Sequence, residues 1–230
     1  MNHVFDVNDA IFDYVYGLAM SDATRRTPCA GSYIDFLDEA ANKAAGIAKK
    51  WVQDYINEIV SESKSLDFYD VAIEVEVQLN SINKLFSFGN AQKLINMVAK
   101  YVYIRNYDAP CDAESFSECH APLDGIMRDF VYRSWFYFKL NSSSRKGPGF
   151  CISGPWSKLK GEKGINEYRA FQIAITQIIE ASGLKKNGES INRLEFDFIF
   201  WEKAKKLKDK DRNGQIEAAK EIWDSILSEK

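Results

Sequence analysis

The spacing of apolar residues along this chain predicts α-helices over most of its length. Apolar residues recur at every third or fourth position in residues 90–105, where Leu94, Val98 and Val102 would share one face of a helix. The same spacing predicts further helices over residues 8–19, 33–60, 122–139, 166–181, 190–207 and 215–227. We therefore expect a mainly α fold, a single domain of roughly eight helices that covers residues 1–230.

Residues 66–79 fit either a helix or a strand. Val71, Val75 and Leu79 have the spacing of a helix face, but together with Ile73 and Val77 they also alternate with polar or small residues, as in a half-buried strand. A single strand without an evident partner would not be stable. The sequence therefore favours a helix here and leaves a strand as the alternative.

Three other segments carry a structural expectation. Residues 195–201 alternate acidic and aromatic side chains, but their flanks are helical, which predicts a buried helix. The helix over 122–139 is expected to begin with Pro122, because proline suits the first helical position. Residues 106–121 and 141–164 lack helical spacing and are predicted to be loops, and a loop as long as the second is uncommon unless it is functional or disordered.

The composition is that of an ordinary soluble protein and excludes a disordered or collagen-like chain. Of the 230 residues, 46% are apolar and 27% are charged. No apolar stretch approaches the roughly 18 residues of a membrane span, so we expect no membrane association. The first residues show no secretory signal pattern, and four cysteines do not form a disulfide framework in a chain of this length. These features predict a cytoplasmic protein with reduced thiols; the cysteines are Cys29, Cys111, Cys119 and Cys151.

The charge is unevenly distributed, although the net charge is only −3. Residues 1–80 hold 6 basic and 14 acidic side chains, a net charge of −8, and form an acidic helical half. Residues 81–230 form the half that contains the candidate functional residues. This half includes a basic loop region, because residues 128–170 hold 9 basic and 3 acidic side chains, a net charge of +6. This distribution permits DNA as a partner, and it also permits a protein partner.

Two short motifs suggest chemistry on nucleic acid. Gly89 precedes Lys93 by four residues at the predicted start of a helix, and a Pro-Leu-Asp sequence that ends at Asp124 starts the next helix. Over about residues 85–133, the chain resembles the helix-hairpin-helix DNA glycosylase superfamily. In that family a tight glycine turn leads into a helix with an early lysine, and Pro-Val-Asp begins the following helix.

The resemblance implies a helix-hairpin-helix element and a DNA glycosylase or lyase activity in DNA repair. The amine of Lys93 would attack the sugar C1′ and displace the damaged base to form an imine. The carboxylate of Asp124 would assist the attack and stabilise the positive charge that develops on the sugar. The target nucleotide must also leave the base stack, which requires basic and aromatic contacts. The residues expected to bind nucleic acid are Gly89, Arg128, Arg133, Trp156, Lys158 and Lys160.

A purely structural role also explains the same two residues. Lys93 would share a solvated helix face with Gly89, Asn96 and Lys100, opposite the apolar face. Asp124 would lie in the first turn of a helix, where unpaired N–H groups and the helix dipole favour a carboxylate. The second functional hypothesis is therefore a non-enzymatic helical interaction or regulatory module, such as a subunit of a defence complex.

Residues 209–216 resemble the first half of a calcium-binding EF-hand loop. Asp209, Asp211 and Asn213 supply oxygen atoms at positions 1, 3 and 5, and a glycine follows at position 6. Position 12, which needs a bidentate glutamate, is Lys220. The alternative is a charged turn between two helices in which Asn213 caps the last helix.

Other cofactor and metal signals are weak. Cys111, Cys119 and His120 lie in one predicted loop, but their spacing does not match that of zinc ligands. The sequence contains no phosphate-binding loop, no dinucleotide-binding glycine pattern and no nucleophile elbow. We therefore expect buried or reduced thiols, no cofactor, and no metal apart from the weak calcium candidate.

Overall fold

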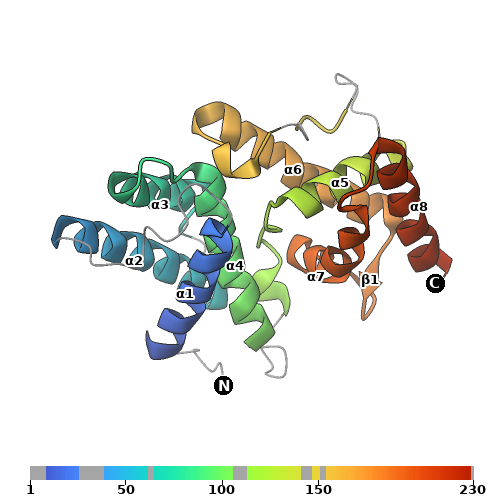
Figure 1. Cartoon of the computed structure of the whole chain (residues 1–230). Coiled ribbons are helices and arrows are strands. Elements are labelled where there is room, and N and C mark those ends of the chain that lie inside the picture. Colours follow the sequence, from blue (N-terminus) through green and yellow to red (C-terminus); the bar gives the residue numbers. More distant parts are fainter. Residues whose placement is uncertain are drawn as a thin grey trace. The chain divides into compact units, whose positions relative to one another are not determined.

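The computed structural model describes residues 9–25, 39–61, 65–105, 113–140, 147–150 and 154–228 (Figure 1). These residues form eight α-helices, three short 3₁₀ helices and one two-stranded hairpin, which confirms the prediction of a mainly α fold. The chain divides into two compact units, which we call the first unit (Met1–Ser117 with Ser157–Ile165) and the second unit (Glu118–Trp156 with Asn166–Lys230). None of the described helices is long and apolar enough to cross a membrane.

Among its described residues, the first unit contains four complete α-helices and the first turn of a fifth. Its elements are α1 (Asp9–Thr24), α2 (Glu39–Ser61), α3 (Phe68–Ile82), α4 (Phe88–Arg105) and the 3₁₀ helix η1 (Ala113–Phe116). α2 packs along α3, and α1 packs along α4 (Figure 1). The helical interpretation of residues 66–79 is confirmed by α3, whose Val71, Val75 and Leu79 are buried.

α4 is the central helix of the first unit, and its first turn is buried on every side. Asn90 donates from Nδ2 to the carbonyl oxygen of Ala23, 2.7 Å away, at the end of α1. Ser87 donates from Oγ to the carbonyl oxygen of Ser157, 2.6 Å away. Because a buried polar group without a partner would cost free energy, these bonds allow polar side chains in this core.

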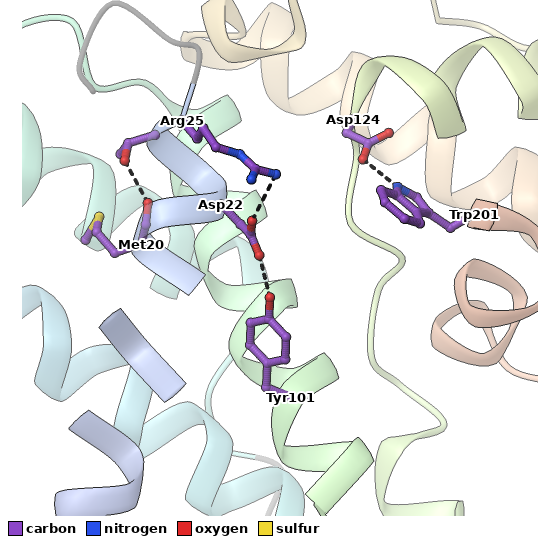
Figure 2. Close-up of polar contacts among 7 residues, drawn as sticks. Met20, Asp22, Arg25, Tyr101, Asp124 and Trp201 are labelled. Carbon is purple, nitrogen blue, oxygen red and sulfur yellow. Dashed lines mark hydrogen bonds and ion pairs between the residues drawn. The ribbon is translucent and has the colours of Figure 1, made fainter. Parts of the chain in front are cut away.

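The end of α1 is also fastened to α4 by a polar cluster (Figure 2). The hydroxyl of Tyr101 donates to the carboxylate of Asp22, which also pairs with Arg25 at 3.5 Å. Burial, and then the neighbouring Asp22 carboxylate, raise the pKa of the Tyr101 hydroxyl. A phenol held protonated in this way serves as a hydrogen-bond donor, so we assign the cluster a structural role.

The second unit is built around a cluster of aromatic rings. Its elements are α5 (Gly125–Tyr137), most of α6 (Gly161–Ser182), β1 (Lys185–Lys186), β2 (Glu189–Ser190), α7 (Arg193–Ala204), η3 (Lys205–Leu207) and α8 (Arg212–Ser228). Phe130 stacks on Phe200 with 5.0 Å between the ring centres, and Phe200 contacts Trp223 in a tilted arrangement with 4.5 Å between the centres. The Trp223 indole N–H donates to Ser134 Oγ, 2.8 Å away.

Several helix boundaries in the structure differ from the predicted ones. The helix over 122–139 begins at Gly125 rather than at Pro122, because Asp124 is its N-cap. The predicted loop over 141–164 is wrong at its end, where η2 (Trp156–Lys158) and the first turn of α6 lie. The buried helix expected over residues 195–201 is confirmed by α7. Residues 33–38, 106–112, 141–146 and 151–153 lie outside the described residues.

The hairpin of β1 and β2 was not predicted. Lys185 pairs with Ser190, and Lys186 pairs with Glu189 in antiparallel register. The turn between the strands is Asn187-Gly188, with φ of 53° and 90°. This dipeptide favours a tight hairpin turn because both residues tolerate positive φ.

Candidate functional site

Asp124 is the predicted catalytic residue whose surroundings are best defined. It is the N-cap of α5, where its Oδ1 accepts the backbone N–H of Met127 at 2.9 Å. Its Oδ2 accepts the indole N–H of Trp201 at 3.1 Å (Figure 2). Both oxygens therefore receive a hydrogen bond, which fixes the orientation of the carboxylate at the start of the helix.

Trp201 connects Asp124 to a cationic side chain. The ammonium nitrogen of Lys205 lies 3.9 Å from the centre of the Trp201 ring, close enough for a cation–π contact. The same nitrogen pairs with Glu202 at 2.6 Å. Asp124, Trp201 and Lys205 thus form a short chain of contacts within the second unit.

Lys93 lies in α4 of the first unit and is half-buried. The alternative that it shares a solvated face with Gly89 and Asn96 is wrong, because both of these residues are buried. The backbone N–H of Gly89 donates to the carbonyl oxygen of Leu159 at 3.2 Å, so this N–H group already has a hydrogen-bond partner within the first unit. Lys93 belongs to the first unit and Asp124 belongs to the second unit. Their joint catalytic use remains a prediction.

The five other predicted nucleic-acid contacts differ in exposure. Arg133 is 7% exposed and donates from Nη2 to Gln215 Oε1 at 2.9 Å. Arg128 donates from Nη1 to the carbonyl oxygen of Gly154 at 2.6 Å. Trp156 is half-buried. The exposed residues of the set are Lys158 and Lys160, both in the first unit.

The candidate calcium loop is a helix cap. Oδ1 of Asp211 accepts the N–H of Gly214 at 2.7 Å, and its carbonyl oxygen accepts the N–H of Gln215 at 2.9 Å. Asn213 lies inside α8, so the expectation that it caps this helix is wrong; Asp211 does so. Asp209 adopts a left-handed φ of 63° in the turn before it. Within the described residues, no group of three or more His, Cys, Asp or Glu side chains could hold a metal ion.

Cys119 and His120 are buried in the second unit. His120 Nδ1 lies 3.0 Å from the Tyr168 hydroxyl oxygen. Burial, and then the charge of Arg193, lower the pKa of His120 well below its usual value. Burial raises the pKa of the Cys119 thiol to about 12, which keeps it protonated and unreactive near neutral pH. The other member of this predicted group, Cys111, lies outside the described residues.

A cationic segment that is not among the predicted nucleic-acid contacts begins two residues after Trp201. Residues 203–212 hold six basic and two acidic side chains, a net charge of +4. All six basic side chains are exposed. We call this set the cationic ridge: Lys203, Lys205, Lys206, Lys208, Lys210 and Arg212. The sequence predicts a basic region at residues 128–170 instead, a helix over residues 190–207, and a candidate calcium loop that shares only residues 209–212 with this segment.

Most of the ridge has no partner within the part of the chain that the structure describes. Lys205 pairs with Glu202, whereas the other five side chains make no ion pair there. The ridge therefore presents several unneutralised positive charges beside a half-buried tryptophan. No family model, curated protein or solved structure matches this chain.

Proposed function

We propose that this chain is a nucleic-acid-binding helical protein and that the cationic ridge contacts the phosphate backbone. Phosphate contacts by lysine and arginine supply most of the affinity of such proteins and need no deep pocket. A run of basic residues that is exposed and unneutralised is the simplest surface of this kind. The main support for this proposal is the position of the basic side chains of the ridge relative to the end of α7 and the start of α8.

The ridge contains charges that the fold itself does not favour. Lys203, Lys205 and Lys206 lie at the end of α7 and in η3, where a helix dipole attracts cations. Lys210 and Arg212 flank Asp211 at the start of α8, where the dipole repels cations. Because they weaken the helix start and have no described partner, their charge is better explained by an external anion.

Trp201 adds an aromatic group beside the ridge. Its indole N–H is held by Asp124, and one of its neighbours is the ridge residue Lys205. Aromatic side chains beside a basic surface supply stacking contacts to bases in single-stranded nucleic acid. We therefore expect single-stranded oligonucleotides to bind at least as tightly as duplexes.

Fluorescence anisotropy with labelled single- and double-stranded oligonucleotides tests the proposal. The variant Lys208→Gln/Lys210→Gln/Arg212→Gln should bind about tenfold more weakly at low salt. The slope of the logarithm of affinity against the logarithm of salt concentration should become shallower by about 2 to 3, because each phosphate contact contributes nearly one unit.

The matched control removes the same number of exposed charges from the first unit. The variant Lys43→Gln/Lys84→Gln/Lys163→Gln should retain the affinity of the unmodified chain within about twofold. Equal losses in both variants would mean that binding depends on net charge alone. No measurable binding to either oligonucleotide form would contradict the proposal itself.

We further propose the glycosylase chemistry as a second candidate function, since Asp124 contacts Trp201 beside the ridge. In this mechanism Lys93 forms an imine with the sugar, and borohydride reduces it to a stable amine. Borohydride treatment with DNA that carries abasic or damaged sites should yield a covalent adduct. Lys93→Ala should abolish the adduct but leave anisotropy unchanged, and an adduct that persists in Lys93→Ala would exclude this mechanism.

A further inference from the structure

α3 of the first unit carries two apolar side chains on its exposed face. Ile73 is 37% exposed and Val77 is 55% exposed, four residues apart on the same side of the helix. Val71 and Val75, on the opposite side, are fully buried. We call Ile73 and Val77 the α3 stripe. These outward residues are also the reason that the sequence of α3 alternates like a strand.

Neither helix formation nor burial explains the α3 stripe. β-branched residues lose side-chain freedom in a helix, so isoleucine and valine are poorer helix formers than leucine, lysine or glutamate. An exposed helix position normally holds one of those stronger helix formers. Helix propensity therefore does not favour two β-branched apolar residues at successive turns of an exposed helix face. Such exceptions are expected where a residue serves a function other than folding.

The charges beside the stripe indicate the kind of partner. Residues 65–83 contain no lysine or arginine. Asp70 and Glu74 lie within about one quarter of the helix circumference from Ile73, and neither carboxylate forms an ion pair with a described residue. Glu76, by contrast, serves the fold, because its carboxylate accepts the N–H of Phe88 and faces Lys160.

A similar face on α1 lacks this charge pattern. Tyr14 and Leu18 are 68% and 39% exposed, also four residues apart. On α1, however, Asp13 pairs with Lys49 and Asp22 pairs with Arg25. Of these two faces, the one on α3 therefore has carboxylates that make no ion pair with a described residue and can attract a cation from outside the unit.

We propose that the α3 stripe docks a cationic amphipathic helix of a protein partner. The apolar side of that helix would cover Ile73 and Val77, and its lysine or arginine side chains would reach Asp70 and Glu74. This is helix-on-helix recognition with apolar anchors one turn apart and a complementary charged rim. It involves the first unit and is independent of nucleic-acid binding by the cationic ridge.

The experiment measures binding of a labelled synthetic leucine–lysine amphipathic helical peptide by fluorescence anisotropy. The variant Ile73→Thr/Val77→Thr keeps the β-branched shape and removes apolar surface, so its fold should be preserved while its affinity falls about tenfold. Asp70→Asn/Glu74→Gln should weaken binding about threefold and reduce its salt dependence. Circular dichroism checks that both variants retain the helical content of the unmodified chain.

The matched control is Tyr14→Thr/Leu18→Thr, which removes a more exposed apolar pair of the same spacing from α1. It should bind the peptide within about twofold of the unmodified chain. The proposal is overturned if the peptide does not bind, if the Ile73→Thr/Val77→Thr variant binds equally well, or if a leucine–glutamate peptide binds as tightly. It is also overturned if sedimentation shows a dimer that this variant dissociates, since the occupant would then be a second copy.

Discussion

Both units bury polar side chains, but they differ in what packs at their centres. In the first unit, the start of the central helix is buried together with polar side chains, and Asn90 and Ser87 bond to backbone oxygens from distant segments. In the second unit, Phe130 stacks on Phe200 and on Trp223, and Phe200 and Trp223 contact each other in a tilted arrangement. Directional hydrogen bonds fix a position and tolerate little change. Aromatic rings bury a large apolar area. Removing one ring from the second core should therefore lower the free energy of unfolding more than removing one polar side chain from the first core.

The surfaces of the two units differ as well. By sequence the first unit has 13 basic and 18 acidic side chains, a net charge of −5, and the second has 17 and 15, a net charge of +2. Each surface contains residues that a helix does not favour. On α3 these are exposed β-branched residues, which are poor helix formers, and at the start of α8 they are cations, which the helix dipole repels. The two proposals rest on these residues and assign the units different kinds of partner.

The largest effect is expected from removing the central aromatic residue of the second unit. Trp223 is fully buried among Phe196, Phe200 and Phe138. Trp223→Ala should lower the free energy of unfolding by about 3–5 kcal/mol, because it removes a large ring and leaves a cavity. Urea denaturation measures the loss, and hydrogen exchange should show it in α5, α7 and α8. Equal loss of protection in α1–α4 would contradict the separation into two cores.

A smaller effect is expected in the polar core of the first unit. Asn90→Ala should cost about 2–3 kcal/mol, because it leaves the carbonyl of Ala23 and the hydroxyl of Ser87 with fewer buried partners. The control is Asn57→Ala, at an exposed position of α2, which should change stability by less than about 0.5 kcal/mol. If the two substitutions had the same effect, the polar network would not support the first core.

The sequence predicted those parts of the molecule that depend on neighbouring residues. α4 has clear helical spacing, and Asp124 was recognised as a residue favoured by a helix start; both expectations depend on a few adjacent positions. The hydrogen bond between Asn90 and Ala23 joins residues 67 positions apart. The contact of Trp201 with Asp124 joins residues 77 positions apart. No local pattern contains such pairs, so the surroundings of the candidate site could not be predicted.

Two features were visible in the sequence and were nevertheless missed. The Asn187-Gly188 turn is a strong hairpin signal, but the strands beside it are only two residues long. The end of the cationic ridge was interpreted as part of a calcium loop because Asp209 and Asp211 have the right spacing for ligands. In the structure one of these residues caps a helix and the other adopts a left-handed turn. Spacing alone does not distinguish a metal ligand from a cap.

The buried histidine of the second unit should make stability depend on pH. The pKa of His120 is lowered in the folded chain, so below about pH 6.5 the unfolded state binds more protons. The contribution of neutral His120 to the free energy of unfolding is therefore complete above that pH. It decreases as the pH falls, by at most about 1.4 kcal/mol per pH unit. Urea denaturation between neutral pH and pH 5 measures the slope.

The control for this slope is His120→Gln, which cannot gain a proton in this range. Burial raises the pKa values of Asp129 and Glu76, and these groups act in the opposite direction, so the difference between the unmodified chain and the variant isolates the histidine. An identical slope in both proteins would mean that His120 does not control acid stability.

The smallest expected effect separates the roles of Asp211. As the cap of α8 it should stabilise the fold, so Asp211→Ala should lower the free energy of unfolding by about 1 kcal/mol. The same change removes a negative charge from between Lys210 and Arg212 and should strengthen oligonucleotide binding about two- to threefold at low salt. Stability and affinity would thus change in opposite directions.

A calcium ligand at the same position predicts a different outcome. Millimolar Ca²⁺ would then raise the melting temperature of the unmodified chain relative to chelator, and Asp211→Ala would abolish that increase. A cap inside a cationic surface predicts no response to Ca²⁺ in either protein, because Lys220 stands where the bidentate carboxylate is needed. If the variant lost both stability and nucleic-acid affinity, the ridge would depend on the shape of the α8 start rather than on its charge, and the electrostatic basis of the comparison between the units would fail.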